Sequence, residues 1–166
     1  MKVRLPFLVF SLLLALLVAF PGAMAWAAEA ETKKADAPAP SKLVVSDAAP
    51  KAIGPYSQAV LAGGFLFASG QIPIDPKTGD LVGGTIEQST ERIFDNLEAV
   101  LKAAGLSFAD VVKTTVYLTK AEDFAAMNGI YGRRMGENKP ARATVIVAAL
   151  PKGAPLEIEL IALARR

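Results

Sequence analysis

The sequence of 166 residues contains no cysteine and no histidine. Because these are the usual ligands of zinc and copper, ordinary sites for those metals are excluded. A Ser-His-Asp triad and a cysteine nucleophile are excluded too, and no disulfide can form. Any catalysis must therefore rely on Arg, Lys, Glu, Asp, Tyr, Ser, Thr or backbone groups.

Much of the hydrophobic content, 52% of the residues, lies in one run at the N-terminus. Lys2 and Arg4 precede an apolar stretch from Leu5 to Phe20, and the small-x-small pattern Ala23-Met24-Ala25 follows. This order predicts that residues 1–28 are a Sec-type secretory signal peptide. The protein is then expected in the periplasm of a two-membrane envelope, and outside the cell otherwise. The alternative is an uncleaved anchor, since the segment is long enough to cross about 30 Å of hydrocarbon.

The chain has no net charge once that segment is removed. Of its 18 basic residues, Lys2 and Arg4 are lost, which leaves 16 to balance 16 acidic residues. Nucleic-acid binding requires a clustered basic face, and Arg133-Arg134 and Arg165-Arg166 are no more than pairs. We therefore expect no nucleic-acid partner, and no membrane association after cleavage.

Residues 29–41 are rich in alanine, proline and charged side chains. Such a segment cannot bury apolar surface, and it predicts a flexible spacer. A single folded domain is then expected over residues 42–166, a length typical of one domain.

Hydrophobic periodicity predicts two helices and five strands within this domain. Capping boxes at Thr85–Gln88 and Thr119–Glu122 open the helices, which end near Gly105 and Met135. The strands are expected at residues 57–61, 65–69, 111–118, 143–150 and 156–164, the first two as a hairpin.

Alternation along two of these strands predicts which side chains share a face. In strand 111–118, one face is formed by Val112, Thr114, Val116 and Leu118. In strand 156–164, one face is formed by Leu156, Ile158, Leu160 and Ala162, and the other by Glu157, Glu159, Ile161 and Leu163.

The order of elements predicts an α+β sandwich, with a mixed β-sheet and two helices on one face. No further element remains to cover the other face, and strand 143–150 is apolar on both sides. Oligomerisation through the open sheet face is therefore expected, because it would bury this apolar surface without a further element.

Two charged residues are candidates for chemistry. Arg142 stands where a strand begins, next to buried surface, which suits a bidentate grip on a carboxylate; a solvated ion pair is the alternative. Glu157 lies inside a strand between Leu156 and Ile158, where a carboxylate tends to be paired or functional. Glu159 has the same placement and competes with it; either could simply face water.

Three polar residues are weaker candidates. Tyr56 follows Gly54-Pro55, so that a turn presents its phenol. Ser69 closes a strand, and Asn128 lies within a helix, where Asn is mildly unfavourable. Each also has a purely structural explanation, as a packed ring, a strand end and a hydrogen bond in the core.

Five sequence segments are informative as a set, because of their order and spacing along the chain. They are Ala52-Ile53-Gly54-Pro55-Tyr56-Ser57-Gln58, Ala68-Ser69-Gly70-Gln71-Ile72-Pro73, Pro140-Ala141-Arg142, Leu150-Pro151-Lys152-Gly153 and Leu156-Glu157-Ile158-Glu159. Together they closely resemble the RidA family, also called the YjgF family, across residues 42–166.

The resemblance implies a chorismate-mutase-like fold and a homotrimer with three clefts between subunits. It implies deamination of 2-aminoacrylate and 2-iminopropanoate, which releases ammonia and a 2-keto acid. Arg142 matches the arginine that binds the substrate carboxylate, and Glu157, rather than Glu159, matches the acid that positions water. The matched substrate-binding residues are Tyr56, Ser69, Gly70 (through its backbone), Asn128, Arg142 and Thr144. Because Thr144 stands where many members have Cys, its backbone rather than a thiol would contact the ligand.

This chemistry is compatible with the residues that the chain has. An imine carbon is already electrophilic, so water needs orientation more than a strong base. Arg142 can fix the carboxylate while Glu157 accepts a proton from water, and no metal or organic cofactor is needed.

Other activities stay open on the same scaffold. The cleft could bind 2-keto acids without turnover, because fold does not fix function, or the protein could act as a chaperone. An endoribonuclease label is also attached to this family, but the missing histidine, the zero net charge and the expected export all oppose it.

Overall fold

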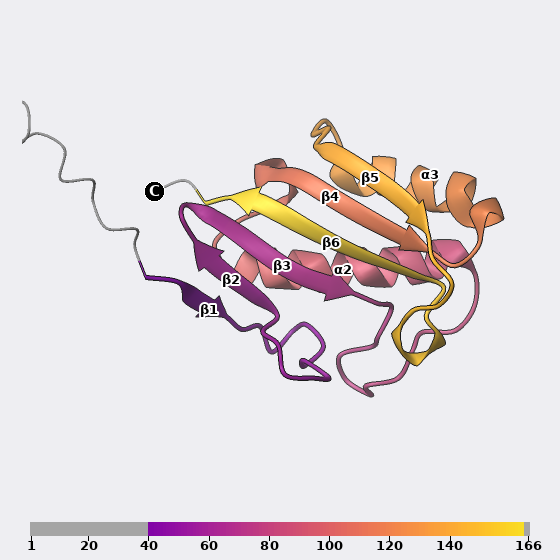
Figure 1. Cartoon of the computed structure of the whole chain (residues 1–166), viewed down its shortest axis with the longest axis horizontal. Helices are drawn as coiled ribbons and strands as arrows, with labels where there is room; N and C mark the ends of the chain where they lie inside the picture. The colour runs from indigo at the N-terminus through magenta and orange to yellow at the C-terminus, as the bar shows by residue number, and fades with distance from the viewer. Residues whose placement is uncertain (1–39, 165–166) are drawn as a thin grey trace, which may run out of the picture. The chain divides into compact units, whose positions relative to one another are not determined.

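The computed structural model describes residues 40–164 (Figure 1). The predicted signal peptide, all but the end of the predicted spacer, and Arg165-Arg166 lie outside the described residues. None of the described helices combines the length and the apolar character needed to cross a membrane.

One mixed sheet of six strands forms the centre of the domain. The strands are β1 (Lys42–Val44), β2 (Ala59–Ala62), β3 (Phe65–Gln71), β4 (Val111–Leu118), β5 (Ala141–Ile146) and β6 (Leu156–Leu163). Their spatial order is β1-β2-β3-β6-β4-β5; only the β4–β5 pair is parallel. The last strand in sequence, β6, is thus central, and β5 lies at an edge.

Two helices cover one face of this sheet, α2 (Ile86–Ala103) and α3 (Phe124–Met135), as Figure 1 shows behind the strands. The capping box that opens α2 is confirmed: Gln88 N–H donates to Thr85 Oγ1 over 3.3 Å, and Thr85 N–H donates to Gln88 Oε1 over 3.0 Å. The predicted α+β class, a mixed sheet with two helices on one face, is confirmed.

The core lies between the helices and one face of β6. The predicted alternation along β6 is confirmed, because Leu156, Ile158, Leu160 and Ala162 are each at most 2% exposed. Burying four such side chains stabilises the domain by several kcal/mol, at roughly 25 cal/mol per Å² of apolar area.

The prediction for one residue of β4 is wrong. A register irregularity between Val111 and Lys113 breaks the alternation, so that Val111 is 2% exposed and Val112 is 41% exposed. A bulge inserts one extra residue into a strand, so the side chains before and after it no longer alternate regularly between the two faces. A prediction that assumes regular alternation assigns such a residue to the wrong face.

The second capping box is also wrong. Thr119 Oγ1 donates to the carbonyl oxygen of Pro155 over 3.1 Å, and a 3-10 turn (Ala121–Asp123) precedes α3. The helix begins at Phe124, and its N-cap residue Asp123 makes no side-chain cap hydrogen bond. The Thr119 hydroxyl therefore ties β4 to the start of β6 instead.

The predicted strand 143–150 is shifted: β5 begins at Ala141, so Arg142 lies within it, and ends at Ile146. Val147 N–H still donates to Leu118 O over 2.8 Å, but β4 ends there and offers residues 148–150 no further partner. β5 is an edge strand, and its apolar side chains Val145 and Ile146 are exposed. The short strand β1 was not predicted, because three residues are too few for a periodic pattern.

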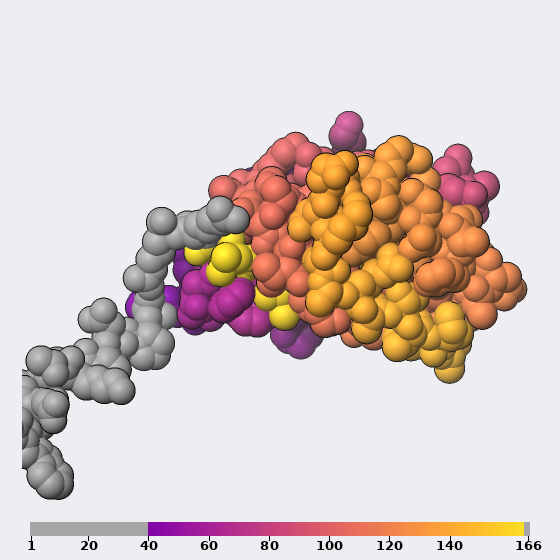
Figure 2. Space-filling model, turned by 90° about the horizontal axis from the view of Figure 1, so that it is seen from above, coloured from indigo at the N-terminus to yellow at the C-terminus, as the bar shows by residue number. Residues whose placement is uncertain are grey.

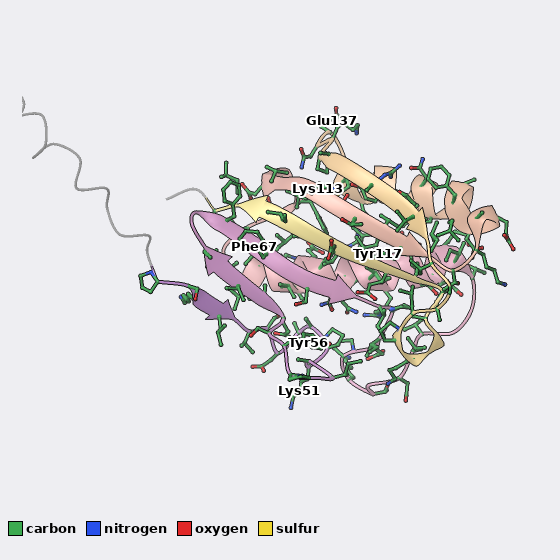
Figure 3. All side chains as sticks on the ribbon, viewed as in Figure 1. Lys51, Tyr56, Phe67, Lys113, Tyr117 and Glu137 are labelled. Atoms are coloured by element: carbon green, nitrogen blue, oxygen red, sulfur yellow. The ribbon has the colours of Figure 1, made fainter. Side chains whose placement is uncertain are left out.

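Within residues 40–164, no helix covers the second face of the sheet. Figure 3 labels Phe67, Lys113 and Tyr117 on this side. Phe65, Phe67 and Leu163 leave 38%, 46% and 36% of their surfaces exposed there. We call this the open face; the predicted oligomer contact through it stays a prediction.

Asn96 of α2 is a buried polar residue that holds the segment after β3. Its Nδ2 donates to the carbonyl oxygens of Ile74, over 2.9 Å, and Ile72, over 3.4 Å. The segment that follows Gly70 is therefore fastened to the helix layer by one amide.

Replacing Asn96 with Ala should lower the free energy of unfolding by about 1–3 kcal/mol, because two buried carbonyls lose their donor. Denaturant unfolding measures this. Thr90→Val is the matched control, because the buried Thr90 hydroxyl donates only to Ile86 O, one turn earlier in its own helix. Equal losses for the two variants would contradict a fastening role for Asn96.

Candidate active site

Arg142 is held on the helix side of the edge strand β5. It stands in register with Thr114, which is buried on that side. Its Nη2 donates to Asn128 Oδ1 over 2.8 Å, and its guanidinium carbon lies 4.5 Å from the ring centre of Tyr131 and 5.9 Å from that of Phe124. A guanidinium stacked on aromatic rings keeps its donors in a fixed fork.

The surroundings of Arg142 favour an anion. Within residues 40–164 it takes part in no ion pair. A hollow of about 450 Å³ adjoins it, with no acidic residue in the lining. The lining residues are Asn128, Tyr131, Gly132, Met135, Asn138, Lys139, Pro140 and Arg142.

Thr144 lies two residues after Arg142, and so on the same side of β5. Its register partner Val116 is fully buried, which confirms the helix-side direction. The Thr144 hydroxyl oxygen is buried and has no hydrogen-bond partner among the described residues. Arg142 is thus hydrogen-bonded to Asn128, and the buried Thr144 hydroxyl lies on the same side of β5.

Glu157 is held differently, on the open face of β6 and opposite Tyr117 of β4. Its carboxylate packs against Gly70, where the register of β3 with β6 shifts between Ala68 and Gln71. A Cβ atom at Gly70 would lie 2.7 Å from Cδ of Glu157 and still closer to a carboxylate oxygen. A side chain at position 70 would therefore require the Glu157 carboxylate to move.

Partial burial and the nearby negative charge of Glu159 raise the pKa of Glu157 above its ordinary value. Burial is the larger cause, since it disfavours the ionised form. A carboxyl group with a raised pKa can exchange a proton closer to neutral pH, which suits general acid–base work.

A second hollow, of about 260 Å³, lies at Glu157 and is mostly apolar. Its lining residues are Ile53, Tyr56, Gly70, Ile72, Pro151 and Glu157. The Tyr56 hydroxyl accepts a hydrogen bond from Ile53 N–H over 3.2 Å, so its own proton remains for another acceptor. Figure 3 labels Tyr56 below the sheet, in the loop before β2.

Ser69 lies next to this hollow but is not among its lining residues. Its hydroxyl donates to Ser57 O over 2.7 Å, and its N–H donates to Gln58 O over 3.0 Å. The proton of this hydroxyl therefore fastens β3 to the segment before β2, and only the oxygen lone pairs are left for a ligand.

The chain brings the predicted site residues together as two separate groups. Arg142, Asn128 and Thr144 lie on the helix side at the β5 edge, which forms the outer surface seen in Figure 2. Glu157 and Gly70 lie at the open face, with Tyr56 beside them. β4 separates β5 from β6, and no residue lines both hollows.

Sequence reasoning missed the two rings that stack on Arg142. Phe124, Asn128 and Tyr131 are spaced by four and three residues along α3, which places them on one helical face. That spacing could have identified them. Among residues 40–164, no three His, Cys, Asp or Glu side chains are grouped so that they could hold a metal ion.

Comparison with known proteins identifies the family. The family model described as Endoribonuclease L-PSP matches residues 46–164. The structure of RidA from an Antarctic Psychrobacter species is 45% identical and superposes with a TM-score of 0.71 over 74% of this chain and 98% of that one. The chain belongs to the RidA family.

Two curated relatives are similar over nearly the whole domain. A RutC family protein of Pyrococcus horikoshii is 54% identical over 121 residues, which is 73% of this chain and 96% of the relative. The human 2-iminobutanoate/2-iminopropanoate deaminase is 50% identical over 121 residues, 72% of this chain and 88% of the relative. RidA-family relatives of this chain thus include deaminases.

The contact between Gly70 and Glu157 can be tested by a double-mutant cycle. Gly70→Ala should destabilise the protein by about 1–3 kcal/mol, because the new methyl group overlaps the carboxylate. In a Glu157→Ala background the same change should cost much less, since the overlapping group is gone.

Gly83→Ala is the control, because a Cβ atom there meets nothing within 4 Å. Its effect should be equal in both backgrounds when unfolding is followed in denaturant. If Gly70→Ala were also equally costly in both, the two residues would not be in contact.

Proposed function

We propose that this protein hydrolyses reactive 2-imino acids and their enamine tautomers, of the 2-iminopropanoate and 2-aminoacrylate type, to 2-keto acids and ammonia. The observation that carries the proposal is Arg142, stacked, oriented and without an ion-pair partner among the described residues. It is suited to bind a carboxylate through two parallel hydrogen bonds. The likeness to the human deaminase supports the same reaction class.

Glu157 supplies the proton transfers in this proposal. Water adds to the C2 carbon of the protonated imine while the Glu157 carboxylate accepts one of its protons. The product is a tetrahedral carbinolamine. Glu157 then returns the proton to the amino nitrogen, the C–N bond breaks and ammonia leaves. The hydroxyl proton passes through the Glu157 carboxylate to the departing ammonia, which leaves as ammonium, so that the hydroxyl oxygen becomes the keto oxygen and Glu157 is ionised again. Imine and water thus give keto acid and ammonia, with no metal or organic cofactor in any step.

We further propose that the complete site forms between copies of the chain in a homotrimer. The Arg142 group and the Glu157 group face opposite sides of one sheet, so a single chain cannot present both to one small molecule. The exposed aromatic side chains of the open face and the unpaired β5 edge are suited to contact neighbouring copies. Arg142 of one copy would then face the Glu157 hollow of the next.

Export is part of the proposal, on the pattern of residues 1–28. The substrates would then be imines that arise outside the cytoplasm. Ligand binding without turnover is the main competing function, since the same two groups would hold a 2-keto acid.

The decisive assay generates 2-imino acids in situ with an amino-acid oxidase or a pyridoxal-phosphate lyase and follows loss of imine. The wild type should accelerate it, and Arg142→Ala should lower kcat/KM by about 10²–10³-fold, because the carboxylate is no longer oriented. Arg133→Ala is the matched control: Arg133 is an exposed partner of Glu91 and should be dispensable. Keto-acid binding without acceleration would select the binding function.

Mixing two inactive variants tests the shared site. Arg142→Ala and Glu157→Gln should each be inactive alone, yet trimers refolded from an equal mixture should regain activity. Random assembly pairs an intact Arg142 with an intact Glu157 in about one quarter of the sites. No recovery from mixed trimers would indicate that both residues act within one chain.

A further inference from the structure

A second carboxylate accompanies Glu157 on the open face, and the reaction proposed above gives it no role. Glu159 lies two residues further along β6, so its side chain points to the same side, about 7 Å along the strand. Both glutamates are partly buried. The next residues on this side are Ile161 and Leu163, so Glu159 places a charge at the border of an apolar region.

Tyr117 links the two glutamates. It stands directly opposite Glu157 in the β4–β6 register, and its hydroxyl donates to Glu159 Oε1 over 3.3 Å. Figure 3 labels this tyrosine beside β6 on the open face. The Tyr117 ring thus lies next to one carboxylate while its hydroxyl holds the other.

We propose that Glu159 and Tyr117 are positioning residues for Glu157: Tyr117 holds the Glu159 carboxylate on the same side of β6 as Glu157, so that Glu159 acts on the catalytic carboxylate through its charge. This inference rests on the proposed function, because it concerns the acid of the same site. Neither residue touches substrate or the reacting atoms in this assignment.

The directions of the pKa shifts of Glu157 and Tyr117 agree with the close placement of the two glutamates and Tyr117. The Glu159 charge raises the pKa of Glu157, after burial as the larger cause. Burial and Glu159 also raise the pKa of Tyr117, so the phenol stays protonated and remains a donor. A like charge on the same side of the strand disfavours the ionised form of Glu157.

Within one copy of the chain, the groups that face Glu157 leave this repulsion uncompensated; in the proposed trimer, Arg142 of a neighbouring copy would add a cation at this hollow. They are Glu159 of its own strand, Tyr117 of β4 and Tyr56 of the loop that lines its hollow, while β3 presents Gly70. No Lys or Arg among residues 40–164 forms an ion pair with Glu157 or Glu159. Lys113, on the same side of β4, donates to the backbone oxygen of Thr114.

The test compares the dependence of kcat/KM on pH in the full-length wild type, Glu159→Gln and Tyr117→Phe. Glu159→Gln should move the limb that reports Glu157 to lower pH, since the repelling charge is gone. Tyr117→Phe should move it in the same direction but less, because Glu159 keeps its charge and turns toward water. Both variants should lose activity a few-fold at the wild-type optimum.

Glu137→Gln is the matched control, because Glu137 is exposed, lies in the loop after α3 and takes part in no ion pair with described residues. Its pH profile should coincide with that of the wild type. If Glu159→Gln lowered activity equally at every pH and left the limb in place, Glu159 would be merely structural and the proposal would be overturned.

A direct titration separates this proposal from the proposed function. The Glu157 carboxyl carbon, labelled with ¹³C and assigned through Glu157→Gln, is followed by NMR against pH in the wild type and in Glu159→Gln. A lower midpoint in the variant supports the positioning pair even if the protein has no deaminase activity. An unchanged midpoint overturns the pair even if the protein is an active deaminase.

Discussion

The structure depends on the strict alternation of the central strand β6. Its four inward side chains build the core against the helices, and the residues between them must then face the other side. Glu157 and Glu159 are on the open face for this reason, because the same alternation that buries Ile158 turns its neighbours outward. The core and the Glu157 part of the candidate site thus lie on the two sides of one strand. A shift of its register by one residue would move the apolar side chains out of the core and the glutamates into it.

Around this strand, the site is positioned by specific small contacts. Gly70 leaves room for the Glu157 carboxylate, and Asn96 fastens the following segment to α2. Arg142 is placed by aromatic rings of α3, which is packed on the same helix layer. Each functional group is therefore supported by an element that also belongs to the core, which favours a rigid site over a flexible one.

Most helices and strands of the fold could be predicted from the sequence. Periodicity located both helices and all strands except β1, and the Thr85–Gln88 capping box fixed the start of α2. The errors have physical causes. The bulge at Val112 and the bond from Thr119 to Pro155 are tertiary effects, and the end of β5 depends on where its partner β4 stops. No local pattern contains that information.

For the candidate site, the motifs indicated the residues but not their grouping. The sequence predicted that Arg142 and Glu157 belong to one site, whereas the sheet register places them on opposite faces of the sheet. The alternation already placed Glu157 and Glu159 on the same side of β6, but the Tyr117 hydroxyl that donates to Glu159 lies 42 positions away along the chain.

The placement of the two groups on opposite faces has a kinetic consequence. If a working site needs Arg142 from one chain and Glu157 from another, an isolated chain is inert however well it is folded. Activity then follows the law of mass action for assembly, and on dilution the rate per chain falls together with the trimer population. Such a design would confine the reaction to conditions in which the chain is concentrated.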